Sequence, residues 1–293
     1  MLAAQTRHPR SDLGAFLRAR RDRLTPAQAG VPAFPGARRV PGLRREELAV
    51  AAGLSLDYYS RLEQGRQATV SQDVLAALAR ALRLDEIETE HLRQLATPSR
   101  LPARQTDRSQ LPDPGLLRLM TTLDHVPALL LGYRGDVLAR NTLLSAVLGR
   151  PLSEGSSFLR YLFLDSLARD RIINWSDFAR PAVATLRRET GRRPNDSALN
   201  ALVGQLRVSD PQVALWWEDN AVRDYASVAK RIQHPDAGEL QFDVEIVAAP
   251  HNPDQRLVIY TAQPDSPTAH MLPILASWGE QLTSEDDHVG PLL

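Results

Sequence analysis

The sequence of 293 residues contains no cysteine. This absence excludes disulfide bonds, thiolate catalysis and cysteine-ligated metal sites. The seven histidines include no HxH or HxxxH pair, so a histidine metal site has little support. Glycine-rich phosphate loops and a GxSxG elbow are also absent from the sequence. We therefore expect that the protein is not an enzyme, that it has no metal site and that it requires no cofactor.

Long apolar runs are missing as well. The sequence has no stretch of about 18 apolar residues, which a membrane-spanning helix needs. The first thirty residues are charged and lack the hydrophobic segment of a signal peptide. Both features favour a cytoplasmic protein that does not enter a membrane. Lysine is nearly absent too, since 34 arginines accompany only Lys230, which indicates a GC-rich genome and says nothing of mechanism.

The net charge of zero hides an uneven distribution along the chain. Residues 1–66 contain twelve arginines and six acidic residues, which gives this segment a net charge of +6. Residues 67–100 carry −1, and the remainder of the chain carries −5. A basic segment of this kind indicates an anionic partner such as nucleic acid.

Within the basic segment, residues 45–62 have the pattern of two short helices joined by a tight turn. Leu48, Ala49 and Ala52 are small or apolar, as the crossing of two close helices requires. Gly53 suits a left-handed turn, and Ser55 can cap the helix that follows. The spacing therefore predicts a helix-turn-helix whose second helix enters a DNA major groove.

The segment LAVAAGLSLDYYSRLEQG, residues 48–65, resembles the helix-turn-helix of Cro/C1-type regulators, also called the XRE family. Further amphipathic helices at 71–84 and 85–96 complete an expected five-helix domain. Position in the second helix predicts base contacts from Leu56, Asp57, Tyr58 and Arg61. The complete predicted set of DNA-binding residues is Arg44, Arg45, Ser55, Leu56, Asp57, Tyr58, Arg61, Gln64 and Arg66.

Two features of this region keep other interpretations open. Amphipathic helices also form hairpins in all-α interaction domains, although the Gly-Leu-Ser turn favours DNA binding. Residues 25–43 carry four prolines and three glycines, so they predict an inserted loop. Arg38 and Arg39 in this loop either follow the DNA backbone or belong to an ordered packing loop.

Residues 97–115 contain four prolines and interrupt the helical periodicity. This composition predicts a linker between a DNA-binding domain at 1–96 and a second domain at 116–293. The second domain begins with two short apolar runs, continues with helical segments and ends with three alternating strands. Asp243 and Glu245 share one face of a strand, which a solvent-facing surface explains better than a catalytic carboxylate pair.

Strands, a block of helices and a three-stranded meander predict a PAS-like α+β sensor fold. The segments 162–187, 229–240 and 253–262 resemble the MmyB-type ligand-binding domain over roughly residues 110–270. The resemblance implies a transcription factor that holds a small apolar ligand, with a fatty acid as the expected class. Residues 216–223, WWEDNAVR, depart from this family pattern where a more basic segment is expected.

A fatty-acid site needs apolar walls and a polar partner for the carboxylate. The aromatic residues of the second domain supply candidates for the walls, and Arg231, His234 and Arg223 are candidate anchors. The predicted ligand-binding set is Phe163, Trp175, Phe178, Trp216, Trp217, Arg231, His234 and Phe242. A last helix at Met271–Leu282 either packs on the sheet or pairs two subunits.

The sequence therefore predicts a multidomain α and α+β protein that regulates transcription. Its N-terminal helix-turn-helix domain binds double-stranded operator DNA as a homodimer, and its PAS-like domain binds the effector. The alternative is a protein-interaction or antitoxin-like module that uses a Cro-type domain without sensing a ligand. An apolar cavity in the second domain distinguishes the two, because an interaction module does not need one.

Overall fold

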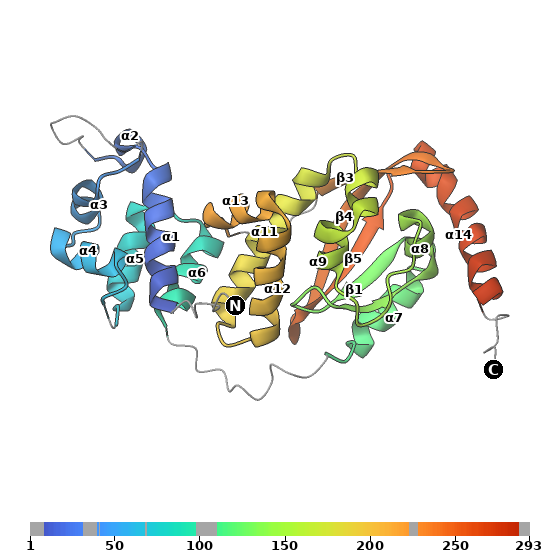
Figure 1. Cartoon of the computed structure of the whole chain (residues 1–293), viewed down its shortest axis with the longest axis horizontal. Coiled ribbons are helices and arrows are strands. Elements are labelled where there is room, and N and C mark those ends of the chain that lie inside the picture. The colour runs from blue at the N-terminus through green and yellow to red at the C-terminus, as the bar shows by residue number, and fades with distance from the viewer. Residues whose placement is uncertain are drawn as a thin grey trace. The chain divides into compact units, whose positions relative to one another are not determined.

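The computed structural model describes residues 9–31, 40, 42–67, 69–97, 110–222 and 228–286 (Figure 1). An α-helical N-terminal region is followed by helices and an antiparallel five-stranded sheet. The predicted fold class, α followed by α+β, is thereby confirmed. The chain divides into two compact units: unit 1 contains residues 1–106, 183–203 and 212–224, and unit 2 contains the remainder. Most of the predicted linker, residues 98–109, lies outside the described residues.

The N-terminal part of unit 1 is built from short capped helices. Ser55, Ser71 and Asp85 each accept a hydrogen bond from the third amide of the helix that they precede. A one-turn helix lies in the segment predicted to be a loop, and Arg38 and Arg39 lie outside the described residues. The helices are α1 (Pro9–Arg23), α2 (Pro26–Ala29), α3 (Arg45–Ala51), α4 (Leu56–Glu63), α5 (Gln72–Ala81) and α6 (Glu86–Ala96).

Unit 2 contains the sheet, in which all neighbouring strands are antiparallel. The strand order is β2-β1-β5-β4-β3, so β5 is central and residues 255–260 of it are buried. The hairpin and the three-stranded meander predicted from alternation are both present. The strands are β1 (Ala128–Leu131), β2 (Val137–Arg140), β3 (Val228–His234), β4 (Gly238–Ala249) and β5 (Asn252–Thr261).

The two faces of the sheet are covered by different elements, because successive strand residues point in opposite directions. Leu257 and Ile259 of β5 belong to an apolar cluster with α7 (Pro114–Thr122). Val258 and Tyr260, which alternate with them, line a cavity on the opposite face. The sheet therefore separates one closed core from one face that contains a cavity.

One helix expected over Phe158–Arg171 is in fact two helices. Asp165 adopts an extended backbone, and its carboxylate accepts a hydrogen bond from the amide of Leu167. This cap begins a new helix, which periodicity alone does not predict. The remaining helices are α8 (Thr142–Leu148), α9 (Phe158–Leu164), α10 (Ser166–Arg171), α11 (Trp175–Arg192), α12 (Ser197–Ser209), α13 (Pro211–Glu218) and α14 (Pro267–Asp286).

Helix α14 covers the predicted C-terminal helix and contacts α8 and β4. Its apolar residues Leu272 and Leu275 are buried, whereas Ile274 and Trp278 are exposed. Of the two roles left open by the sequence, packing within the sheet unit is observed.

Helix α11 belongs to both units, because its residues up to Ala182 group with the sheet and those from Val183 onward group with the N-terminal helices. Pro181 lies inside this helix, where it removes one backbone hydrogen bond. Within unit 1, Arg187 donates a hydrogen bond to the side-chain oxygen of Asn220 (2.6 Å). Arg20 of α1 donates a hydrogen bond to the backbone oxygen of Asn220 (3.0 Å). Asn220 thus connects α11 to the N-terminal helices.

Candidate nucleic-acid interface and ligand cavity

The turn between α3 and α4 is built from small and apolar residues. Leu48, Ala49 and Ala52 are buried at the point where the helices meet. Gly53 has a φ of 66°, in the left-handed region that glycine adopts without strain. The amide of Leu54 then donates to the carbonyl oxygen of Ala49 (2.8 Å). The left-handed turn predicted from the sequence is therefore present.

Helix α4 has a buried face and a solvent face. Tyr59 and Leu62 are buried in the core of unit 1. Leu56 is 47% exposed, and Arg61 forms an ion pair with Asp57 on the same outer face (3.0 Å). Since an exposed ion pair of this kind contributes about 0–1 kcal/mol, it can be exchanged for DNA contacts at little cost. The first turn of α4 and Arg61 are thus accessible to a major groove.

The other predicted DNA-binding residues surround this face in different environments. Ser55, Gln64 and Arg66 are exposed, whereas Tyr58 and Arg44 are half-buried. Ser55 caps α4 through the amide of Tyr58 (3.2 Å), so its hydroxyl has a structural role as well. Their contacts with DNA stay a prediction.

Glu63 at the end of α4 is the centre of a buried charged cluster. Its carboxylate accepts hydrogen bonds from Arg21 of α1, Arg45 of α3 and Tyr59, each at 2.7 Å. Burial opposes ionisation of Glu63, but these three donors outweigh it and hold its pKa below the ordinary value. Arg45 is still 46% exposed, so its guanidinium can contact a phosphate while it also holds Glu63. The cluster joins three helices of the DNA-binding region.

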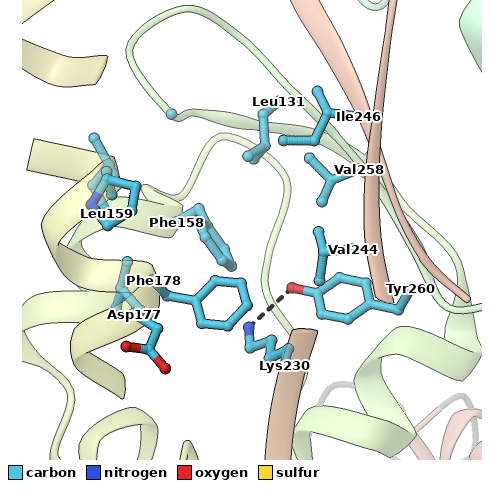
Figure 2. A pocket seen from close by; sticks show the side chains of 14 residues that line it. Leu131, Phe158, Leu159, Asp177, Phe178, Lys230, Val244, Ile246, Val258 and Tyr260 are labelled. Carbon is cyan, nitrogen blue, oxygen red and sulfur yellow. Dashed lines mark hydrogen bonds between the residues drawn. The ribbon is translucent and has the colours of Figure 1, made fainter. Parts of the chain in front are cut away.

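Unit 2 encloses an apolar cavity of about 70 Å³ between one face of the sheet and helices α9 and α11 (Figure 2). The strands β1, β4 and β5 present aliphatic side chains to it, and α9 presents Phe158, Leu159 and Leu162. Helix α11 lines the cavity with Asp177, Phe178, Pro181 and Ala182. Its walls therefore suit an apolar molecule.

Lys230 on β3 brings an amine into this apolar cavity. Its side chain is fully buried, and Nζ donates a hydrogen bond to the Tyr260 hydroxyl (3.0 Å; Figure 2). The rings of Tyr260, Phe178 and Phe158 lie 4.9, 5.0 and 5.7 Å from Nζ. Burial lowers the pKa of Lys230 to about 7, because the ammonium loses its hydration. Among the described residues no carboxylate forms an ion pair with it, and burial is the cause of its lowered pKa.

Comparison with protein families matches both halves of the chain. Residues 12–92 match a helix-turn-helix domain. Residues 112–275, more than half of the chain, match the MmyB-like transcription regulator ligand binding domain. The chain belongs to the MmyB-like transcription regulator family. Comparison with curated proteins gave no match.

The family membership agrees with the resemblance predicted from the sequence. The helix-turn-helix match covers the turn at Gly53 and the outer face of α4. The ligand-binding match contains every residue that lines the cavity, from Leu131 to Tyr260. This MmyB-like regulator is therefore a DNA-binding transcription regulator with a ligand-binding domain.

The predicted aromatic wall residues of the regulator lie in several places, and one of them lines the cavity. Phe178 contributes its ring to the wall beside Lys230. Phe163 and Trp175 pack edge to face on each other, with ring centroids 5.9 Å apart. Trp217 is buried beneath the guanidinium of Arg187 in unit 1. The remaining two are Trp216, half-buried on α13, and Phe242, whose ring packs against Tyr260 (5.8 Å).

The predicted anchors lie away from the cavity lining. Arg231 is exposed on β3 and forms an ion pair with Glu239 (2.7 Å). His234 is buried, but its Nε2 contacts the carbonyl oxygen of Ala146 (3.1 Å). Arg223 lies outside the described residues. None of these contacts places a charge in the cavity.

Lys230 is the residue that sequence reasoning missed, although the signal was present. It alternates with Ala229 and Arg231, and it shares a strand face with the buried Ile232. A lysine on the apolar face of an alternating strand implies a buried amine. That pattern identifies Lys230 as a candidate site residue and places Arg231 on the solvent face.

Two features are absent from the part of the chain that the structure describes. None of these helices combines the length and the apolar character that a bilayer span requires. No group of three or more histidine, aspartate or glutamate side chains is arranged to hold a metal ion in the same part of the chain.

Proposed function

We propose that the regulator reads operator DNA with the first turns of α4, and that a small apolar effector in the Lys230 cavity changes its affinity for that DNA. The observation that carries the first part is the exposed outer face of α4, where Leu56, Asp57 and Arg61 lie on a helix capped by Ser55. Leu56 can contact a thymine methyl group, and Arg61 can donate two hydrogen bonds to guanine. Gln64 and Arg66, which follow the end of α4, contact phosphates, as the resemblance to Cro/C1-type regulators implies.

We further propose that two copies of the chain bind a palindromic operator. Proteins of the helix-turn-helix type commonly bind as dimers to half-sites about one helical turn apart, roughly 34 Å. Selection of bound sequences from random DNA tests this arrangement. Two inverted half-sites at this spacing are expected, and recovery of a single half-site argues for a monomer.

The substitution Arg61→Ala is expected to weaken operator binding by about 1–3 kcal/mol, which corresponds to about 5- to 150-fold in Kd. The loss should be concentrated at one base position, where the variant accepts other bases almost equally. Fluorescence anisotropy at fixed salt, with operators that differ at single positions, measures both effects.

Arg93→Ala is the matched control, because Arg93 is also exposed and forms a similar ion pair with an acidic residue one helical turn away. This variant should keep the affinity and the base preference of the wild type. If Arg61→Ala weakens binding equally on every sequence, Arg61 contacts phosphate and does not read a base.

For the effector we propose a fatty acid, the class implied by the resemblance to MmyB-type domains. The cavity volume of about 70 Å³ is less than half of the roughly 150 Å³ apolar cavity that accepts benzene. An acyl chain of eight or more carbons therefore requires movement of an element that lines the cavity. Helix α11 is a lining element, and it continues past Pro181 into unit 1. Such movement couples the cavity to the DNA-binding helices.

Fatty acids from octanoate to tetradecanoate, added to the complex with the selected operator, test this modulation. At least one of them is expected to change the operator Kd by about 5- to 150-fold, the usual range of an allosteric coupling. Measurements below the critical micelle concentration, with 1-butanol as a solvent control, avoid a detergent effect. An unchanged Kd across the series contradicts modulation by a fatty acid and leaves DNA binding intact.

A further inference from the structure

Lys230 is an unusual residue for the inner face of a sheet. Lysine is almost never fully buried without a charged partner, yet Lys230 has no exposed surface and one neutral hydrogen-bond partner. Its neighbours on this face include the aliphatic Val244 and Val258 and the aromatic Phe242. An aliphatic residue in its place would avoid the desolvation of an amine. The amine therefore has a role other than stabilising the fold.

The surroundings of the Lys230 amine indicate which ligand group can accept its unused hydrogen bonds. A lysine ammonium has three N–H donors, and the hydrogen bond to Tyr260 uses one of them. The Tyr260 hydroxyl accepts that bond, so its own hydrogen can be donated elsewhere. The Phe158 and Phe178 rings add negative ring faces near the amine but no hydrogen-bond acceptor. A carboxylate, which has two oxygens, can accept hydrogen bonds from both the ammonium and the Tyr260 hydroxyl.

We propose that the acidic group of the effector binds between the Lys230 ammonium and the Tyr260 hydroxyl, so that these two side chains set the preference of the cavity for an anion. This inference deepens the proposed function and rests on it for the identity of the pocket. The aliphatic walls accept the rest of the molecule. Asp177 is the other charged residue in the lining, and as an acid it cannot neutralise an anion. Lys230 thus distinguishes acids from the corresponding alcohols and esters.

Binding of the acid should depend on pH. The titratable groups that face the cavity are Asp177 from α11 and Tyr260 from β5, whereas α9, β1 and β4 present apolar side chains. Burial raises the pKa of Tyr260, so its hydroxyl stays protonated. Because the pKa of Lys230 is about 7, the fraction of ammonium falls above neutral pH. Acid binding should weaken by about tenfold for each pH unit above that value, since only the ammonium attracts the anion.

Isothermal titration calorimetry of the full-length chain with octanoate and 1-octanol tests the proposal. The wild type should bind octanoate at least about tenfold more tightly than 1-octanol at pH 6.5, because a charge-assisted hydrogen bond is lost with the alcohol. Lys230→Met should lose about tenfold or more in octanoate affinity and keep its affinity for 1-octanol. Tyr260→Phe should lose several-fold. Arg231→Met, a change of the adjacent exposed arginine, is the matched control and should behave as the wild type.

Circular dichroism establishes that each variant is folded before titration. Equal binding of octanoate and 1-octanol by the wild type overturns the proposal. So does full octanoate affinity in Lys230→Met, or no octanoate binding by the wild type. A Kd that does not change between pH 6.5 and 8.5 also contradicts the role of the ammonium.

Two results distinguish a failure of the acid site from a failure of the proposed function. If octanoate binds through Lys230 but leaves the operator Kd unchanged, the acid site stands and modulation of DNA binding fails. If 1-octanol and octanoate change the operator Kd equally in the wild type and in Lys230→Met, modulation stands and the acid anchor fails.

Discussion

Replacement of Glu63 by alanine is expected to destabilise the helix-turn-helix region by about 3–5 kcal/mol, the usual result of removing one partner from a buried ion pair. The side chain of Glu63 is inaccessible to solvent, and that of Arg21 is only 6% exposed. Without the carboxylate, the Arg21 guanidinium and the Tyr59 hydroxyl lose their shared acceptor. Helices α1, α3 and α4 meet at this carboxylate, so operator binding should fall together with stability.

The pH dependence of this contribution follows from the direction of the pKa shift. The pKa of Glu63 is lowered in the folded state from an ordinary value of 4.5. The carboxylate therefore stabilises the fold fully above pH 4.5 and loses this effect as the pH falls through the lower folded value. Wild type and Glu63→Ala should differ most near neutral pH and converge in acid.

Amide hydrogen exchange of α1 and α4 measures this loss separately from the stability of the sheet unit. Glu90→Ala is the matched control, because Glu90 is 56% exposed and pairs with Arg93 on the surface of α6. Its effect should stay within about 0.5 kcal/mol. Exchange in α1 and α4 of Glu63→Ala at the wild-type rate would show that the cluster is not needed for stability.

The local features of the DNA-binding region could be predicted from sequence because short-range chemistry determines them. Gly53 is the residue that tolerates a left-handed turn, and Ser55 supplies the cap of the next helix. The Glu63 cluster could not be predicted in this way, because Arg21 and Glu63 are 42 residues apart along the chain. Contacts over that distance depend on how the helices pack.

The sheet illustrates the same division between local and long-range information. The alternation of apolar and polar residues predicted its strands, and it also indicates the strand face on which Lys230 lies. It could not predict the cavity, because the walls come from six segments between Leu131 and Tyr260 that meet only in the folded chain. Aromatic residues were expected at the ligand, and most of them instead pack in cores or on helices, as Phe163 and Trp175 do. The break at Asp165 depended on a single cap that competes with helix propagation.

Replacement of Lys230 by methionine is expected to stabilise the regulator by about 2–4 kcal/mol at pH 6, within the range found when buried charges give way to apolar side chains. Methionine fills a similar volume without an amine to desolvate. The pKa of Lys230 falls from 10.5 in an unfolded chain to about 7 in the fold, so the unfolded state binds more protons between these values. Wild-type stability should therefore rise with pH from about 7 to 10.5, by about 4–5 kcal/mol in total. The lost cation–π contacts and the Tyr260 hydrogen bond make the gain in the variant smaller than this.

Urea unfolding at pH 6, 7, 8 and 9 measures both the gain and its pH dependence. The curve of Lys230→Met should lack the rise above pH 7, whereas that of Arg231→Met, the exposed neighbour, should keep it. Identical pH dependence in wild type and Lys230→Met would mean that the amine is hydrated in solution and that the cavity is open to water. A variant that is more stable but no longer binds octanoate, by contrast, indicates that Lys230 serves ligand binding and lowers the stability of the fold.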